Sequence, residues 1–276
     1  MIRVVLAGLA IVIALSCLLA PPAVAEDSGI ERLYILDCGV NAAKDQSRWS
    51  PGINVGRPIE FSDNCYLIRH AKGLLLWDTG IPDAVAAMPD GLPAANGTIV
   101  LHRTKTLIAQ LDAIGVKPAD ITYVAISHTH GDHVGNVGLF PSSTVLIQRA
   151  EYEWALGQPV KPGFVDTQRI EQLSGDRDVF GDGSVVIFST PGHTPGHQSL
   201  LVVLPKTGAI VLSGDAVHFR ENWDARRVPT FNTSREQTLN SMERIASVLK
   251  DRKAQLWINH DQAQSRQLRY APEYYE

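Results

Sequence analysis

The sequence has no long run of basic residues, and this absence limits the partners that the protein can have. Its 276 residues include 25 Lys or Arg and 29 Asp or Glu, which gives a formal net charge of −4 at pH 7. Proteins that bind nucleic acids usually present a basic patch to the phosphate backbone. We therefore expect no nucleic-acid partner.

Cysteine is scarce, and no Gly-x-Ser-x-Gly motif occurs, so the chain lacks the strand–turn–helix elbow of many serine hydrolases. Beyond residue 25 the only cysteines are Cys38 and Cys65, each in an apolar segment typical of a strand. A disulfide between them and two buried free thiols both fit this pattern. Neither lies near the histidine cluster described below, so we expect no thiolate ligand there.

The longest apolar run, Val4 to Ala20, lies at the N-terminus after Arg3. It precedes Pro21-Pro22 and the small-residue cleavage pattern Ala23-Val24-Ala25, which is typical of a secretory signal peptide. A membrane anchor is the alternative, but the two prolines and the cleavage pattern argue against it. We expect a signal peptide over residues 1–25 and one domain over 26–276. The mature protein would be periplasmic or secreted, with no stable membrane anchor.

One hexapeptide concentrates residues that bind metals. His128-Thr129-His130-Gly131-Asp132-His133 follows the apolar run Tyr123 to Ile126, which has the length of a buried strand. The chain has nine histidines in all, so three within six positions are unlikely to gather by chance. Imidazoles and a carboxylate suit Zn²⁺ or a similar divalent ion. The hexapeptide therefore predicts a metal site.

Other expected strands also end at an acid or a histidine. We expect such ends at Asp78, His128, His197, Asp215 and His260. In mixed α/β folds, loops at the carboxyl ends of strands assemble binding sites. Further expected elements are a helix over 104–114, a helix over 150–156, a loop over 40–60 and a helix opened by Ser234 and Gln237.

These residues are enough for two ligand sets. His128 and His130 can reach one ion together with an imidazole from elsewhere in the chain. Asp132 and His133 can hold a second ion with another imidazole. The two oxygens of Asp215 can bridge the pair, and His197 and His260 are the remaining imidazoles considered. We expect two divalent metal ions, with Zn²⁺ as the first choice.

The hexapeptide resembles the signature of the metallo-β-lactamase superfamily, and the chain most resembles its N-acyl-homoserine lactonases, which quench quorum signals. Supporting stretches are Asp78-Thr79-Gly80, Gln148 to Glu153, and Thr190-Pro191-Gly192-His193-Thr194-Pro195-Gly196-His197-Gln198-Ser199-Leu200. The likeness covers nearly all of residues 26–276. It implies a small acyl lactone substrate and a homodimer formed through the 40–60 loop.

The resemblance also implies an α/β fold, the αββα sandwich, and a set of roles. It assigns His128, His130 and His197 to one metal, Asp132, His133 and His260 to the other, and Asp215 to both. Asp78 would orient a ligand histidine. His193 shares the Pro-Gly-His context of His197, and we expect it to be structural.

The expected reaction is hydrolysis of the lactone ring by a hydroxide that bridges the two metals, since metal-bound water reaches a pKa of about 7. Asp132 is the candidate that protonates the leaving oxygen. His218 stands where the best-known lactonases commonly have Tyr, and it is a candidate hydrogen-bond donor to the substrate. The alternative is a histidine that merely lies beside the site.

Two further departures concern Gly131, where a bulky apolar residue is common, and Asn259, where Gly is common. Both are expected to affect acyl-chain preference. Candidate residues for acyl binding lie in or beside the loops between the motifs: Met88, Trp154, Phe164, Phe219 and Trp223.

Three rival functions are weaker. β-Lactamases typically carry Cys or Ser in place of the bridging Asp215. A thioester hydrolase of the glyoxalase II type keeps the full ligand set but needs a basic patch for glutathione. A non-catalytic binding module would not need all seven ligands.

Overall fold

The computed structural model describes residues 1–2, 29–164 and 166–276. The predicted signal peptide and its cleavage site therefore lie outside the described residues, apart from residues 1 and 2. Among the described residues, no helix combines the length and the apolar character needed to cross a membrane.

Two β-sheets form the centre of the structure. The larger sheet has the strand order β4-β5-β1-β2-β3-β6-β7-β8, and the smaller has the order β13-β12-β11-β10-β9. The larger sheet contains β1 (Ile30–Ala43), β2 (Ile59–His70), β3 (Gly73–Trp77), β4 (Leu92–Ala94), β5 (Ile99–His102), β6 (Ile121–Ala125), β7 (Thr144–Gln148) and β8 (Arg169–Leu173). The smaller contains β9 (Arg177–Asp178), β10 (Val185–Ser189), β11 (Gln198–Leu204), β12 (Gly208–Leu212) and β13 (Gln255–Trp257).

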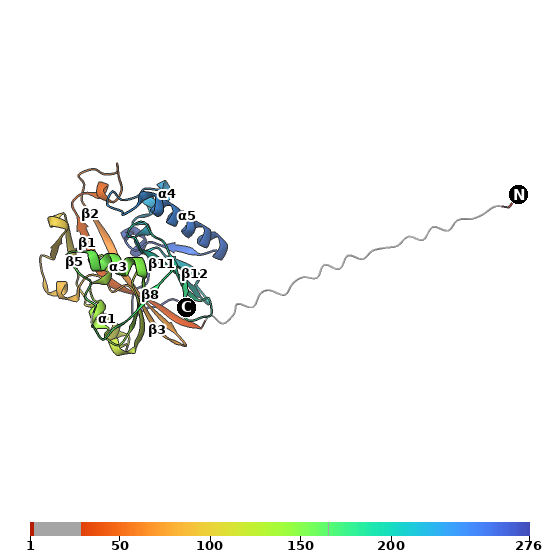
Figure 1. Cartoon of the computed structure of the whole chain (residues 1–276), viewed down its shortest axis with the longest axis horizontal. Coiled ribbons are helices and arrows are strands. Elements are labelled where there is room, and N and C mark those ends of the chain that lie inside the picture. Colours follow the sequence, from red (N-terminus) through yellow and green to blue (C-terminus); the bar gives the residue numbers. More distant parts are fainter. Residues whose placement is uncertain (3–28, 165) are drawn as a thin grey trace.

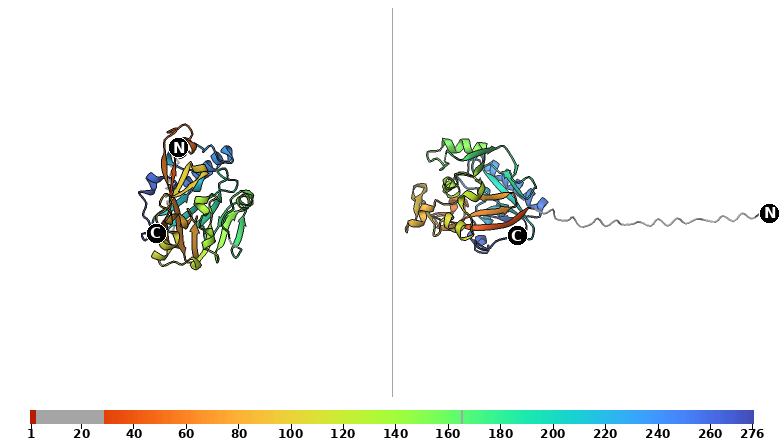
Figure 2. Two further views of the ribbon diagram at one scale, coloured as in Figure 1. Left: turned by 90° about the vertical axis from the view of Figure 1, so that its left-hand side faces the viewer. Right: turned by 90° about the horizontal axis from the view of Figure 1, so that it is seen from below.

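Helices cover the outer faces of the two sheets (Figures 1 and 2). The helices of the described chain are α1 (Leu107–Ala113), α2 (Gly131–Val134), α3 (Arg149–Gly157), α4 (Arg220–Ala225), α5 (Arg235–Arg252) and α6 (Gln262–Ser265). Short 3₁₀ turns are η1 (Gln46–Arg48), η2 (Asp83–Ala87), η3 (Ala95–Gly97), η4 (Pro118–Asp120), η5 (Val137–Leu139) and η6 (Gly214–Ala216).

Three apolar layers hold these parts together. The central layer lies between the sheets and includes Ile68, Trp77 and Leu200. On the outside of the larger sheet, a second layer joins α1 to strands β6 and β7. On the outside of the smaller sheet, a third layer packs Met242 and Ile245 of α5. This order of helix, sheet, sheet and helix confirms the predicted αββα fold.

Several local predictions are also confirmed. Helix α5 begins where its cap was expected, because the hydroxyl of Ser234 accepts a hydrogen bond from the backbone N–H of Gln237 at 3.2 Å. Helix α1 lies within the predicted range 104–114, and α3 contains the predicted range 150–156. Periodicity and caps are local signals, so these elements follow directly from the sequence.

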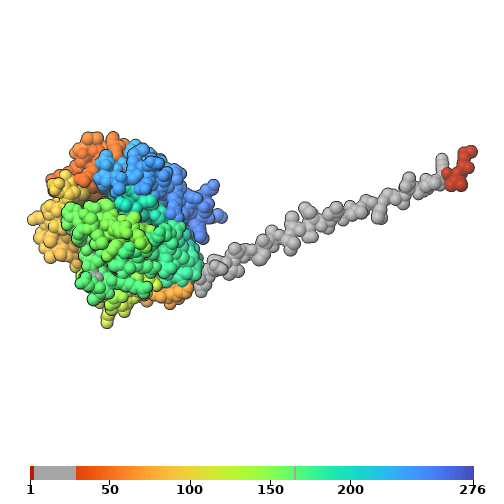
Figure 3. Space-filling view, viewed as in Figure 1, coloured from red at the N-terminus to blue at the C-terminus, as the bar shows by residue number. Residues whose placement is uncertain are grey.

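The segment after the first strand was predicted less well. Strand β1 continues to Ala43 and β2 begins at Ile59, so residues 40–43 and 59–60 belong to strands and not to the expected loop. The connection that follows contains η1 and lies beside α4, as the orange and light blue segments of Figure 3 show, and hydrogen bonds join Trp49 and Ser50 to Asn222. Cys38 and Cys65, on the paired strands β1 and β2, form a disulfide with their Cα atoms 5.7 Å apart.

Candidate metal centre

Strand ends bring the acidic and histidine side chains to one edge of the sandwich. Strand β3 pairs in parallel with β6, and β12 pairs in parallel with β13. Because parallel strands end at the same edge, Asp78 after β3 lies beside the hexapeptide after β6. Likewise, Asp215 after β12 lies beside His260 after β13. The predicted convergence of these four segments is confirmed. The strand end expected at His197 is wrong, because β10 ends at Ser189 and His197 immediately precedes β11.

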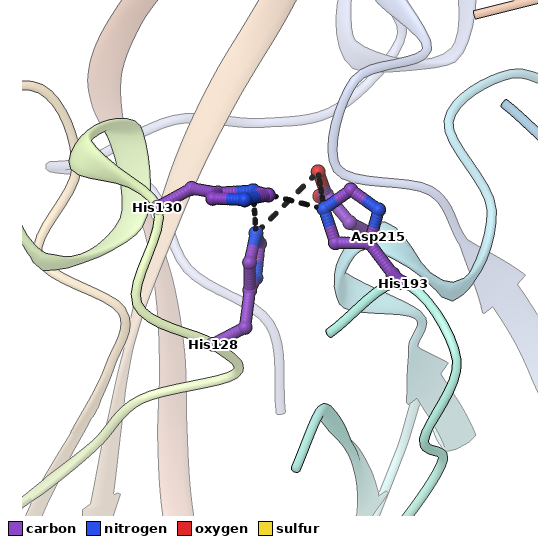
Figure 4. Close-up of side chains that lie close together, drawn as sticks. All are labelled: His128, His130, His193 and Asp215. Atoms are coloured by element: carbon purple, nitrogen blue, oxygen red, sulfur yellow. Dashed lines mark hydrogen bonds and ion pairs between the residues drawn. The ribbon is translucent and has the colours of Figure 1, made fainter. Parts of the chain in front are cut away.

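The first donor group comprises His128, His130 and His193, and Figure 4 shows their rings directed toward one another and toward Asp215. Nδ1 of His130 lies 2.9 Å from Nε2 of His128 and 3.0 Å from Nε2 of His193. Oδ2 of Asp215 lies 3.3 Å from Nε2 of His193. These four side chains offer ligand atoms within 4.8 Å of one another, which suits one metal ion.

The second donor group comprises Asp132, His133 and His260. Nε2 of His133 and Nε2 of His260 lie 3.4 Å apart. Oδ1 of Asp215 lies 3.2 Å from the first of these atoms and 3.1 Å from the second. One carboxylate oxygen of Asp215 therefore faces each donor group, as expected of a bridging ligand.

The bonds on the outer side of each ring indicate which nitrogen is free to bind a metal. Nδ1 of His260 lies 2.7 Å from the backbone carbonyl of Ser62, and Nδ1 of His193 lies 2.9 Å from the side-chain oxygen of Asn232. A carbonyl oxygen only accepts, so each Nδ1 carries a proton and each Nε2 can present a lone pair to the centre. Oδ1 of Asp215 is buried and accepts no hydrogen bond from the residues that the structure describes. This donor set fits divalent metal ions.

The charges of the second group also favour a cation. Burial lowers the pKa of His260, but Asp215 and Asp132 outweigh burial and raise it to about 9. The pKa of His133 is likewise raised well above its usual value: burial opposes the rise, and Asp215 and Asp78 cause it. These carboxylates thus draw protons onto the two imidazoles where no metal is bound. The same negative charge attracts a metal cation.

His197 does not join the first donor group, so the prediction that made it a ligand and His193 structural was wrong. Its Nε2 accepts a hydrogen bond from the backbone N–H of Asp215 at 2.8 Å, and its Nδ1 donates to the carbonyl of Thr190 at 3.0 Å. Both ring nitrogens are therefore occupied. Burial lowers the pKa of His197 to about 3, which keeps the ring neutral. Its role is to hold the turn that carries Asp215.

Asp78 supports a ligand as expected. Its Oδ2 lies 2.9 Å from Nδ1 of His133. The same carboxylate accepts hydrogen bonds from the backbone N–H and the hydroxyl of Ser127 at 2.7 and 2.8 Å. Asp78 is 1% exposed. It therefore fixes both the ring of His133 and the start of the hexapeptide loop.

Asn259 also supports a ligand, and it does not line the cleft beside the metal centre. Its side-chain oxygen accepts a hydrogen bond from the backbone N–H of Asn64 at 3.0 Å, and its amide donates to Asp63 at 3.2 Å. Burial raises the pKa of Asp63 to about 7. The expectation that Asn259 affects acyl-chain preference has no support in these contacts, which fasten the neighbouring His260 to strand β2.

Two further residues support the site and were not predicted from the sequence. Asn41 donates a hydrogen bond to Oδ2 of Asp132 at 3.0 Å, from the end of β1 that was expected to be loop. Glu151 is fully buried and accepts bonds from the backbone N–H of Thr129 at 2.8 Å and of Gly196 at 3.1 Å. Its carboxylate therefore joins the hexapeptide to the loop that carries His193. Nothing in the local pattern of α3 signals this role.

A cleft, here called the metal cleft, opens beside both donor groups. Besides the donors, its lining includes Asn41, Arg48, Trp49, Phe61, Ile99, Leu101, Gly131, His218 and Phe231. Nε2 of His218 lies 3.0 Å from Oδ2 of Asp215, and its buried Nδ1 has no hydrogen-bond partner in the described part of the chain. Of the acyl-binding candidates, Trp154 lines a second cleft that shares His130 and Gly131 with the metal cleft, and Phe219 lines a third cleft that includes His260.

Comparison with known proteins identifies the family of this chain. Residues 59–252 match the family model described as the metallo-beta-lactamase superfamily. The chain belongs to the metallo-β-lactamase superfamily. The fold and the donor groups described above are those of a member of this superfamily, and the predicted resemblance is confirmed.

Relatives within the superfamily are similar over most of their length. An N-acyl homoserine lactonase of Azorhizobium caulinodans is 33% identical, covering 89% of this chain and 98% of that protein. One from Bacillus thuringiensis is 31% identical, covering 89% and 99%. A solved N-acyl homoserine lactone hydrolase, with N-hexanoyl-L-homoserine bound at its catalytic metal centre, has a TM-score of 0.80 at 31% identity over 89% of this chain and 99% of its own.

Proposed function

We propose that this superfamily member is a hydrolase that opens the lactone ring of N-acyl homoserine lactones, and that it thereby quenches quorum signals. The observation that carries the proposal is the pair of donor groups that share Asp215. Relatives named as N-acyl homoserine lactonases also match this chain over most of its length. Ring opening is an addition of water across the ester bond, and it needs a nucleophile, a polarised carbonyl and a proton for the leaving oxygen.

The proposed cofactor is a pair of divalent metal ions, with Zn²⁺ as the expected species because imidazole and carboxylate ligands suit it. One ion would be held by His128, His130 and His193, and the other by Asp132, His133 and His260, with Asp215 shared. Bound there, the ions would supply a hydroxide at neutral pH and would polarise the lactone carbonyl.

The remaining roles fall to the side chains around the ions. Asp132 is partly exposed to the metal cleft and is held in place by Asn41, so it is well placed to carry a proton to the leaving ring oxygen. Burial lowers the pKa of His218, which keeps its ring neutral. A neutral His218 donates from Nε2 to Asp215 or, in its other tautomer, from Nδ1 into the cleft toward the substrate.

Thioester hydrolysis is disfavoured by the charge of the metal cleft. Among the described residues that line it, Arg48 is the only Lys or Arg. Arg48 already donates to the hydroxyl of Thr98 at 3.0 Å and lies 5.6 Å above the ring of Trp49. A glutathione thioester carries two carboxylates and would need more cationic partners than this.

The deciding experiment measures hydrolysis of an N-acyl homoserine lactone, a cephalosporin and a glutathione thioester by the zinc-loaded protein. We expect rapid turnover of the lactone and slow or no turnover of the other two. Rapid turnover of the thioester alone would overturn the proposal. Metal analysis of the active protein should give two equivalents per chain, and full activity with one equivalent would contradict the shared role of Asp215.

We further propose that the protein is exported to the periplasm or secreted, because the sequence begins with a signal-peptide pattern. Homodimerisation stays a prediction from the family resemblance. Fractionation of the native host, followed by light scattering of the purified protein, tests both.

A further inference from the structure

A cleft formed mainly by the segment between α4 and α5 is lined by three arginines. It is here called the arginine cleft, and its cationic side chains are Arg226, Arg227 and Arg235. Figure 1 shows the two helices side by side. None of the described residues that line this cleft is Asp or Glu, although the chain has 29 acidic and 25 basic residues. The cleft is therefore a positively charged region on a protein of net negative charge.

The guanidinium groups of this cleft use only part of their hydrogen-bonding capacity within the protein. Nη2 of Arg226 lies 3.1 Å from Oε1 of Glu243, and its guanidinium carbon lies 4.7 Å from the centroid of the Trp223 ring. Nη1 of Arg226 is buried and has no hydrogen-bond partner among the described residues. Nη1 of Arg227 donates to an uncharged acceptor, the backbone carbonyl of Glu221, at 3.4 Å. Because a buried donor without an acceptor costs free energy, a ligand that supplies acceptor oxygens here would bind favourably.

Arg235 stands where a cation opposes the stability of its helix. It is the first residue of the 18-residue helix α5, and the N-terminal end of a helix carries a partial positive charge. The other charges at the ends of α5 suit this dipole, with Glu236 in the first turn and Lys250 and Arg252 in the last. An anion in the arginine cleft would turn the unfavourable charge of Arg235 into a favourable one.

The arginine cleft adjoins the segment that supports the first donor group. Asn232 lines this cleft, and its side-chain oxygen accepts a hydrogen bond from Nδ1 of His193 at 2.9 Å. The backbone N–H of Thr233 donates to the carbonyl of His193 at 3.1 Å. Phe231, the residue before Asn232, lines the metal cleft instead. The segment therefore separates the two clefts, and a ligand in the arginine cleft leaves the metal cleft free.

We propose that the arginine cleft binds a small tetrahedral dianion, either inorganic phosphate or the phosphate group of a monoester. Guanidinium groups present paired N–H donors that match phosphate oxygens, and the described lining holds no carboxylate that would repel the ligand. The bound dianion would fix the segment that contains Asn232 and thereby strengthen the support of His193. The inference goes beyond the proposed lactonase activity and is independent of it, because it concerns another cleft and another ligand.

The test is a calorimetric titration of the zinc-loaded protein with inorganic phosphate and with glycerol 3-phosphate at constant ionic strength. We expect Arg227→Gln and Arg235→Gln each to weaken binding roughly tenfold or more, because each removes a charge-assisted hydrogen bond. Arg252→Gln is the matched control. It removes the same charge from the exposed last turn of α5, so the affinity should stay within about twofold. Tighter binding of glycerol 3-phosphate would identify a monoester as the ligand, and equal or weaker binding would identify the inorganic ion.

The double variant Arg227→Gln/Arg235→Gln separates the arginine cleft from the metal centre, whose ions can also bind phosphate. Zinc content and circular dichroism should match those of the wild type. Phosphate should raise the Tm of the wild type more than that of the double variant, because a ligand stabilises the folded state that binds it. No binding by the wild type, or affinity unchanged in the double variant, would overturn the inference and leave the lactonase proposal untouched.

Discussion

The two donor groups that share Asp215 differ in what holds their imidazoles. In the second group, the outer nitrogen of His133 meets the buried carboxylate of Asp78, and that of His260 meets a backbone carbonyl. In the first group, the outer partners of His128 and His193 are a hydroxyl and a side-chain amide. In His130 the nitrogen that faces the donor group is Nδ1, and among the described residues no hydrogen bond to the outer nitrogen, Nε2, occurs. The second group is therefore more rigidly supported and more negatively charged.

This difference predicts an order of metal affinity. A carboxylate partner makes an imidazole more basic and fixes its orientation, and the second group also contributes Asp132 as a charged ligand. We expect the second group to hold its ion more tightly, so that a chelator removes the first group's ion before the other. The following variants test the comparison, from the largest expected effect to the smallest.

Asp215→Asn removes the charge that both groups share and should have the largest effect. Lactone kcat/KM should fall well beyond the roughly 10–100-fold typical of residues that only support a ligand. Zinc content, measured by atomic emission, should drop at both positions. Retention of two equivalents with high activity would show that Asp215 is not a common ligand.

His193→Gln and His197→Gln separate a ligand from a residue of the same local sequence. The first should lose one zinc equivalent and most of the activity, because it removes a donor of the first group. The second should keep two equivalents but unfold more easily by roughly 1–3 kcal/mol, because two buried hydrogen bonds lose their partner. The opposite pattern in metal content would restore the original prediction for His197.

Asp78→Asn and Asn232→Ala compare the supports of the two groups directly. We expect the Asp78 variant to lower kcat/KM by roughly 10–100-fold and to weaken the second group's ion. The Asn232 variant removes a neutral partner of His193 at a half-exposed position, so its effect should stay below about tenfold. Equal losses in the two variants would remove the proposed difference in affinity.

His218→Phe should have the smallest effect on metal content and a moderate effect on rate. His218 contacts the oxygen of Asp215 that faces the first group. We expect two zinc equivalents to remain and kcat to fall by roughly tenfold, which is about the worth of one hydrogen bond of this kind. Unchanged kinetics would reject its role beside the substrate.

The sequence predicted the sandwich and most of the donor set because those signals are local. Apolar runs identify strands, and an acid or a histidine follows the carboxyl end of the strands before Asp78, His128, Asp215 and His260. His193 and His197 were confused because both follow Pro-Gly in one octapeptide. What separates them is the pairing of strands: His197 immediately precedes β11, and its carbonyl accepts a bond from Thr190, whereas His193 lies in the middle of the loop. No spacing rule encodes that pairing.

Supporting residues were harder to predict because their partners are distant in the sequence. Asn259 bonds to residues almost 200 positions earlier, and Asn41 bonds to Asp132 across 91 positions. A single sequence does not show which residues so far apart in the chain lie close together in the fold. The sequence shows that Asn259 is unusual at its position. Its support of the neighbouring His260 depends on contacts with strand β2 of the other sheet, which the sequence does not show.

The contacts of Glu151 also limit which amino-acid substitutions this protein can tolerate. A Cβ atom on Gly196 would lie 2.2 Å from the backbone nitrogen of Glu151, so no other residue fits there unless helix α3 moves. The carboxylate of Glu151 reaches both the hexapeptide and this glycine's loop. A substitution in the hexapeptide, in the Gly196 loop or in α3 therefore disturbs contacts with the other two segments. We expect such substitutions to be tolerated only together with compensating changes in those segments.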